Sequence, residues 1–158
     1  MIRHYETLTR RPIDLTDLGP KERKALQRVF NEYKKNPKWG RFSTLWQKEL
    51  DGALRGTSVR ARIRHPVYRV AQDLEMRLGI AQGVVAPPDY RDYIVDWIEV
   101  RFGSRYNFCK KTGIREAFLS QVLSGKKDFS MAKLREVAEA LGLRIELSPE
   151  GPMRTAVA

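Results

Sequence analysis

The chain has 158 residues, 42% hydrophobic and 31% charged, a balance typical of one large or two small soluble globular domains. Thirty lysines and arginines oppose 19 aspartates and glutamates, and the resulting net charge of +11 favours a polyanionic partner, nucleic acid before an anionic membrane surface. A single cysteine excludes an internal disulfide, and the absence of a long apolar run argues against a membrane span or signal peptide, so we expect a cytoplasmic protein.

Residues 1–84 predict a basic helical domain of unknown role. Short extended pieces are expected within residues 2–8 and 13–15. Pro20 is placed to open a first helix, because proline is tolerated at the first helical position, and Pro37 follows its end. Its apolar residues recur at helical spacing, at positions 26, 29, 30 and 33.

A second helix is predicted over residues 41–54 and a third over residues 66–81, each with one apolar face. Amphipathic helices must cover such faces, so the three helices are expected to share a small core. Between them, residues 60–64 are expected to form an irregular basic connection. Its arginines, Arg60, Arg62 and Arg64, either add phosphate contacts or lie solvated in a loop.

Residues 85–148 predict a second domain, which follows a short corner containing Pro87 and Pro88. Four helices are expected, over residues 90–102, 105–112, 115–124 and from Ser130 to 141. Residues 143–147 then alternate apolar and polar side chains, which predicts a short terminal strand. Residues 149–158 are expected to be a disordered tail, and the fold class is all-α.

The most informative segment is the pair of short helices on either side of Gly113. A glycine permits the tight turn that lets two such helices pack at a steep angle. The spacing of the apolar residues predicts that Ile114, Leu119 and Val122 face the first helix. The side chains left pointing outward, near the start of the second helix, are those of Arg115, Glu116, Ala117, Ser120 and Gln121.

These outward residue types suit the reading of base edges. Glutamine can bond two edges of adenine, arginine can bond O6 and N7 of guanine, glutamate can accept from cytosine, and alanine can pack on the thymine methyl group. Hydrogen-bond donors that can hold phosphates flank the second helix: Ser104, Arg105, Ser124, Lys126 and Lys127. Ser104 and Arg105 also stand at the start of the first helix, where backbone N–H groups favour an anion.

The span 104–147 resembles the Cro/C1-type, or XRE-family, helix-turn-helix domain of phage repressors and bacterial regulators. The matching features are Thr112-Gly113, the run Leu119 to Lys126, and the later helix ending Ala140-Leu141-Gly142. The resemblance implies a lambda-repressor-like domain in which Arg115, Glu116, Ala117 and Gln121 read bases, and Ser104, Arg105, Ser124 and Lys126 contact phosphates. Many members carry serine or threonine where Arg115 stands, and arginine cannot cap a helix in that way.

Charge is distributed unevenly along the chain. Residues 1–88 hold 18 basic and nine acidic residues, whereas residues 89–158 hold 12 and 10. Within residues 104–127, however, six basic side chains accompany only Glu116. The acids of the preceding helix, Asp89, Asp92, Asp96 and Glu99, are expected to face away, which would leave a basic face on a nearly neutral domain.

The sequence gives no positive indication of catalysis, a cofactor or a metal. His4 and His65 lie far apart without ligand spacing, and Cys109 is expected to be a small core residue. No Ser/His/Asp or Cys/His set and no glycine-rich phosphate loop is found, so we do not expect an enzyme.

The leading functional hypothesis is a sequence-specific, double-stranded DNA-binding transcriptional regulator, a dimeric repressor. Dimer contacts come from the N-terminal helices or from strand 143–147 pairing with its mate; alternatively this strand pairs within the chain, with residues 2–8. The second hypothesis is an antitoxin-like interaction module, in which residues 1–84 bind a protein partner and DNA binding is autoregulatory or absent. A nonspecific nucleoid or RNA binder is the third.

Overall fold

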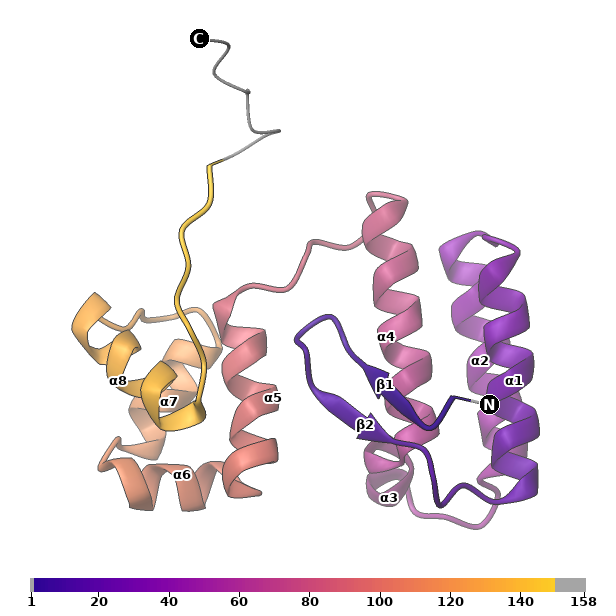
Figure 1. Cartoon of the computed structure of the whole chain (residues 1–158), viewed down its shortest axis with the longest axis horizontal. Helices are drawn as coiled ribbons and strands as arrows, with labels where there is room; N and C mark the ends of the chain where they lie inside the picture. Colours follow the sequence, from indigo (N-terminus) through magenta and orange to yellow (C-terminus); the bar gives the residue numbers. More distant parts are fainter. Residues whose placement is uncertain (1, 150–158) are drawn as a thin grey trace, which may run out of the picture. The chain divides into compact units, whose positions relative to one another are not determined.

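The computed structural model describes residues 2–149, and within them it contains eight helices and one two-stranded sheet (Figure 1). The chain divides into two compact units, Met1–Asp89 and Tyr90–Ala158. The prediction of a mainly helical protein is confirmed, with a small sheet added to it. The division falls a few residues after the expected boundary at position 84.

The N-terminal unit joins a β-hairpin to a group of helices. Strands β1 (His4–Glu6) and β2 (Pro12–Asp14) pair antiparallel, with Tyr5 opposite Ile13. The helices are α1 (Pro20–Lys34), α2 (Trp39–Ala53), α3 (Val59–Arg64) and α4 (Pro66–Ala81).

One apolar core holds α1, α2 and α4 together. Phe42, Trp46 and Leu50 recur at every fourth position of α2 and are at most 1% exposed. The indole of Trp46 donates a hydrogen bond to the Glu75 carboxylate of α4, so the only polar atom of this ring is satisfied. The apolar spacing in the sequence therefore identified the buried faces correctly.

Asp73 of α4 attaches the hairpin to this core. Its carboxylate accepts hydrogen bonds from the Tyr5 hydroxyl at 2.6 Å and from the Leu8 backbone N–H at 2.8 Å. Arg77, one turn along α4, donates to the same carboxylate at 2.7 Å and to the Glu6 carbonyl at 3.0 Å. Side chains far from the hairpin in sequence thus determine where it lies.

The prediction of an irregular connection over residues 60–64 is wrong, because this segment is the helix α3. The Ser58 hydroxyl caps its start by accepting from the Ala61 backbone N–H at 3.2 Å. Arg62 turns toward α2 and pairs with Asp51. A serine cap and one ion pair stabilise a short helix in which no residue is buried.

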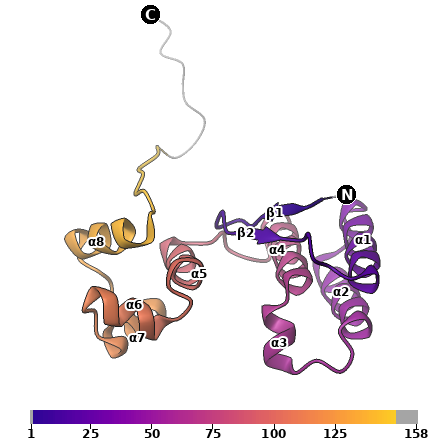
Figure 2. The same ribbon diagram turned by 60° about the horizontal axis from the view of Figure 1, so that its bottom comes forward.

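Between Tyr90 and residue 149, the C-terminal unit contains four helices, as the sequence predicted. They are α5 (Tyr90–Phe102), α6 (Arg105–Thr112), α7 (Glu116–Leu123) and α8 (Met131–Leu141), and they surround a second apolar core (Figure 2). Its most deeply buried members include Ile98, Phe108, Val122 and Leu141, each 0% exposed.

The predicted terminal strand is also wrong: residues 143–149 form neither helix nor strand. The Leu143 backbone N–H bonds back to the Ala138 carbonyl at 2.8 Å and so closes the end of α8. The predicted alternative, pairing with residues 2–8, is wrong as well, because within the described residues β1 belongs to a two-stranded sheet with β2 as its partner. Alternation predicts only which side chains share a face, whereas a strand also needs a neighbour for its backbone groups. Of the predicted tail, residues 150–158 lie outside the described part of the chain.

Candidate nucleic-acid interface

A glycine turn separates α6 from α7. Gly113 ends α6 in the left-handed conformation, with φ +76°, and its N–H bonds to the Cys109 carbonyl at 2.9 Å. The Thr112 hydroxyl donates to the Phe108 carbonyl at 2.8 Å, which satisfies another acceptor at this helix end. The turn therefore has the local geometry that the Thr112-Gly113 pair predicts.

The inner face of α7 anchors it to the core. Leu119 is 1% exposed and Val122 is fully buried, while Ile114 of the turn is half-buried. The helix begins at Glu116, and Arg115 occupies the capping position without a side-chain hydrogen bond to the backbone. The prediction that Arg115 cannot act as a side-chain cap is confirmed.

The outer face of α7 carries the five predicted base-reading residues. Arg115, Glu116, Ala117 and Ser120 are exposed, and Gln121 is half-buried one turn further along. In the described part of the chain, no hydrogen bond or ion pair occupies the side chains of these residues. Their polar groups are thus available to an external partner.

The predicted phosphate-contacting residues lie at the surface, but some of their side chains already make hydrogen bonds within the chain. The Ser104 oxygen accepts from the Asn107 backbone N–H at 3.1 Å, which leaves its own proton to donate. The Ser124 hydroxyl already donates to the Gln121 carbonyl at 3.1 Å, so a phosphate would have to displace that bond. Arg105, Lys126 and Lys127 are exposed.

A polar network that the sequence analysis missed supports the loop after α7. Arg91 of α5 pairs with Asp128 and donates from Nε to the Val122 carbonyl at 2.9 Å, while the Tyr90 hydroxyl bonds to Asp128 at 2.8 Å. Each of these contacts joins two residues that are separated in the sequence by between 31 and 38 positions. No local pattern could have revealed them.

Two aromatic residues of this region, Phe118 of α7 and Tyr106 of α6, were also missed. Phe118 packs edge-on against Phe129 with ring centroids 5.7 Å apart, and the Lys127 ammonium lies 6.0 Å from the Phe118 ring. Tyr106 of α6 is 60% exposed. Tyr106 stands two positions before the buried Phe108, so helical periodicity places it on nearly the opposite side of α6.

The α6–turn–α7 surface is strongly cationic. Its six basic side chains are all exposed, and none has an ion pair within the described residues: Arg105, Lys110, Lys111, Arg115, Lys126 and Lys127. On α5, Asp92, Asp96 and Glu99 follow one another at i, i+4 and i+7, opposite the buried Ile94 and Ile98. These three acids therefore lie on the side of α5 away from its core, whereas Asp89, which was expected on the same helix, precedes its first residue, Tyr90.

Cys109 lies under this surface and is 6% exposed. Burial, with a smaller contribution from the Glu116 carboxylate, raises the pKa of its thiol. A neutral, buried thiol is a packing residue, in agreement with the sequence interpretation.

Within residues 2–149, no group of three or more metal-ligating side chains is found, and no helix is long and apolar enough to cross a membrane. The exposed arrangement of amide, guanidinium, hydroxyl and ammonium groups can bind an extended polyanion by hydrogen bonds and charge. Neither a protein-family model, nor a curated protein, nor a solved structure matches the chain, so the interpretation of this surface depends on its own residues.

Proposed function

We propose that the protein is a sequence-specific, double-stranded DNA-binding transcriptional regulator that places α7 in the major groove. The observation that carries this proposal is the outer face of α7, where exposed polar side chains have no hydrogen-bond or ion-pair partner within the described residues, in a segment, residues 104–127, that holds six exposed cations and one acid. A helix fits the major groove, where each base pair presents a distinct pattern of donors and acceptors.

Within the proposal, Gln121 and Arg115 make the sequence-reading contacts. The Gln121 carbonyl accepts backbone N–H groups from Lys126 at 2.9 Å and Lys127 at 3.2 Å. These bonds are made by the backbone carbonyl and hold the chain at the end of α7, while partial burial of the Gln121 side chain restricts its amide. A restricted amide loses less conformational freedom when it bonds a base. Glu116, Ala117 and Ser120 complete the face that meets the base edges.

Phosphate contacts come from both ends of this surface. Ser104 and Arg105 begin α6, where orphan backbone N–H groups and the helix dipole attract an anion. Lys126 and Lys127 lie on the loop that Arg91 and Asp128 hold in place. These contacts would set the register of α7 without reading sequence.

The proposed regulator acts as a dimer, because one short recognition helix reads few base pairs. Two copies on half-sites about 34 Å apart would supply the missing affinity and specificity. Residues 143–147 offer one surface for this contact, since Leu147 is 90% exposed and Ile145 39% exposed. Light scattering at micromolar concentration, with and without DNA, tests the dimer, and a monomer under both conditions contradicts it.

Selection of bound duplexes from a random DNA pool tests the function itself. On the selected sequence, we expect Gln121→Ala to weaken binding by about 1–3 kcal/mol and to relax the preference at one position. Lys126→Ala should weaken binding to every duplex and reduce the salt slope by about one unit.

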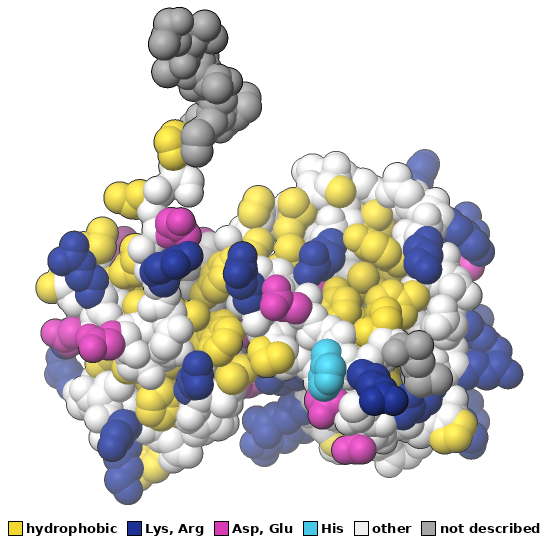
Figure 3. All heavy atoms as spheres, viewed as in Figure 1, with side chains coloured by type: hydrophobic (Ala, Val, Ile, Leu, Met, Phe, Trp, Pro, Cys, Tyr) yellow, Lys and Arg dark blue, Asp and Glu magenta, His cyan; other side chains and the backbone are white. Residues whose placement is uncertain are grey.

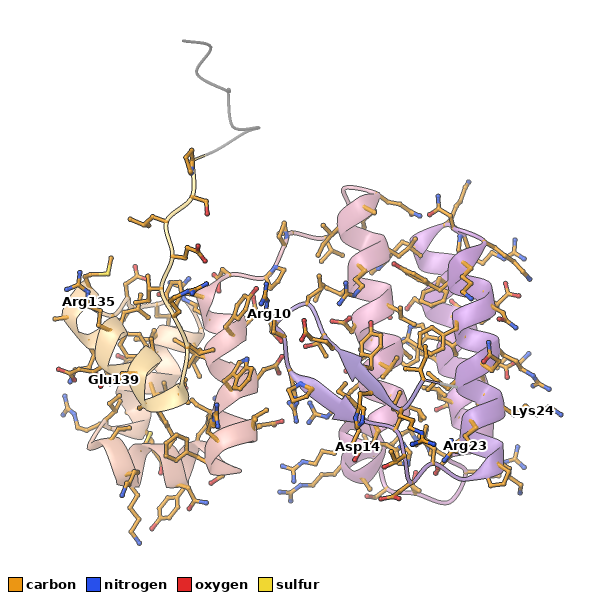
Figure 4. The ribbon with its side chains drawn as sticks, in the orientation of Figure 1. Arg10, Asp14, Arg23, Lys24, Arg135 and Glu139 are labelled. Atoms are coloured by element: carbon orange, nitrogen blue, oxygen red, sulfur yellow. The ribbon has the colours of Figure 1, made fainter. Side chains whose placement is uncertain are left out.

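Arg135→Ala is the matched control for the loss of one charge. Arg135 is an exposed residue of α8, and Figure 4 shows its side chain projecting outward from that helix. We expect this variant to bind like the parent protein. If no sequence is enriched, or if the Gln121 and Lys126 variants behave alike on every duplex, the proposed function is wrong.

A further inference from the structure

The loop between α7 and α8 carries an acid directly after two lysines. Lys126, Lys127 and Asp128 follow one another, and the Asp128 side chain is 74% exposed. The protein has a net charge of +11, and on the face drawn in Figure 3 lysine and arginine side chains are widespread, whereas acidic side chains occupy a few places. A carboxylate beside two phosphate-binding lysines repels a phosphate, so its presence there calls for a physical reason.

Two residues at the start of α5 hold Asp128. Its carboxylate pairs with the Arg91 guanidinium and accepts a hydrogen bond from the Tyr90 hydroxyl at 2.8 Å. The Arg91 guanidinium also lies over the Tyr90 ring, 4.6 Å from its centroid. We call Tyr90, Arg91 and Asp128 the loop clamp.

The loop clamp also holds the end of α7. Arg91 donates from Nε to the Val122 carbonyl at 2.9 Å, in the last turn of the helix, where the helix dipole favours a cation. The Gly125 backbone N–H bonds to Val122 as well, at 2.9 Å. One guanidinium therefore connects the last turn of α7 to Asp128, and the two lysines lie between these points in the sequence.

Lys126 and Lys127 are thus held on both sides by the loop backbone. Their backbone N–H groups bond to the Gln121 carbonyl at 2.9 Å and 3.2 Å. The buried Phe129, which follows Asp128, packs edge-on against Phe118. Within the described residues, neither lysine has an ion pair. The backbone of the two lysines is fixed, while their ammonium groups remain available to an anion.

We propose that the loop clamp positions Lys126 and Lys127 for the phosphate backbone of DNA, so that an acid, Asp128, strengthens DNA binding. This inference rests on the proposed function, which assigns phosphate contacts to the two lysines. A loop that is already ordered loses less conformational freedom when it binds. The paired Arg91 guanidinium offsets the charge of the carboxylate, so little repulsion of phosphate remains. Tyr90, Arg91 and Asp128 act through the lysines and are positioning residues.

Asp128→Ala in the full-length chain tests this proposal, because positioning and charge predict opposite changes in affinity. If only the charge of Asp128 matters, its removal tightens binding to every duplex. If the loop clamp positions the lysines, we expect roughly 10-fold weaker binding at constant salt, since a hydrogen bond to a charged group contributes about that factor. The loss should be the same on the selected duplex and on an unrelated duplex, and the slope of log affinity against log salt should fall by about one unit.

Two controls carry the same change of charge. Asp128→Asn keeps an oxygen that can accept from Tyr90 and Arg91, so its affinity should lie between those of the parent protein and Asp128→Ala. Glu136→Ala removes an acid of α8 that is 66% exposed and pairs with Lys133 of the same helix at 2.6 Å. We expect this variant to bind no more weakly than the parent protein. If Asp128→Ala binds as tightly as the parent or as Asp128→Asn, the inference is wrong.

Native-state hydrogen exchange without DNA examines the loop directly. The backbone N–H groups of Lys126 and Lys127 should exchange faster in Asp128→Ala than in the parent protein or in Glu136→Ala, because the loop is held less firmly. The N–H group of Ile98, in the buried part of α5, reports whether the unit is still folded. Parent-like exchange of both lysines in Asp128→Ala overturns the inference.

Gln121→Ala, measured beside these variants, separates this inference from the proposed function. If α7 does not read sequence, Gln121→Ala changes nothing, while Asp128→Ala still weakens binding to every duplex. If the loop clamp does not position the lysines, only Gln121→Ala weakens binding, and its effect is confined to the selected sequence. If neither variant changes binding to any duplex, both proposals are wrong.

Discussion

Gly113→Ala should destabilise the C-terminal unit by a predictable amount. At φ +76°, an added Cβ would meet no atom within 4 Å, so no clash contributes. The cost is the left-handed backbone itself, about 1–2 kcal/mol for an L-residue. The smaller conformational freedom of alanine in the unfolded chain offsets about 0.4–1 kcal/mol. The expected net loss is about 1 kcal/mol, or roughly 4–8 °C in Tm for a domain of this size.

The chain offers a control of opposite sign. Gly52 lies in α2, has no left-handed φ, and its added Cβ would also meet nothing within 4 Å. Gly52→Ala should therefore stabilise the N-terminal unit by about 0.5 kcal/mol, because alanine favours helix. Gly113→Asn is a second control, since asparagine tolerates the left-handed region better than alanine does, and its loss should be smaller.

Native-state hydrogen exchange measures both units in the same molecule. Peptides from α6 and α7 report the Gly113 variants, and peptides from α2 report the Gly52 variant. If Gly113→Ala is as stable as the parent, or less damaging than Gly113→Asn, the turn between α6 and α7 is not left-handed. The geometry that presents α7 would then be wrong as well.

Two further predictions concern the hairpin of the N-terminal unit. Asp73, whose side chain is 9% exposed, accepts three donors, so Asp73→Ala should cost about 3 kcal/mol by urea titration, whereas exposed Asp17→Ala should be near neutral. Burial, then the hydrogen bond to Asp73, raises the pKa of Tyr5 above its ordinary 10.0. Folding favours the protonated Tyr5 phenol, so the contribution of Tyr5 to the free energy of unfolding is complete below about pH 10 and is lost as the pH rises further. Tyr5→Phe should flatten the decline in stability above about pH 10, and an equal decline in both proteins there contradicts this assignment.

The sequence alone was sufficient for the long helices and for the face that each one buries. In α4, Val67, Val70, Ala71, Leu74 and Leu78 repeat at helical spacing, and that spacing depends only on the local backbone geometry. Capping is local in the same way, so Ser104, Gly113 and Ser130 indicated helix ends correctly. Apolar spacing and helix capping also predicted which side of α7 is exposed.

Tertiary structure decided the features that depend on distant partners. Arg60, Arg62 and Arg64 are equivalent in sequence, yet only Arg62 finds an acid, because α2 brings Asp51 to it. Likewise, Asp128 supports the loop after α7 only because α5 brings Tyr90 and Arg91 beside it. Residues 143–147 alternate like a strand but have no neighbouring strand within the described chain, so their backbone remains unpaired there. Periodicity records which way a side chain faces, whereas ion pairs and strand pairing need a second segment whose position only the folded chain determines.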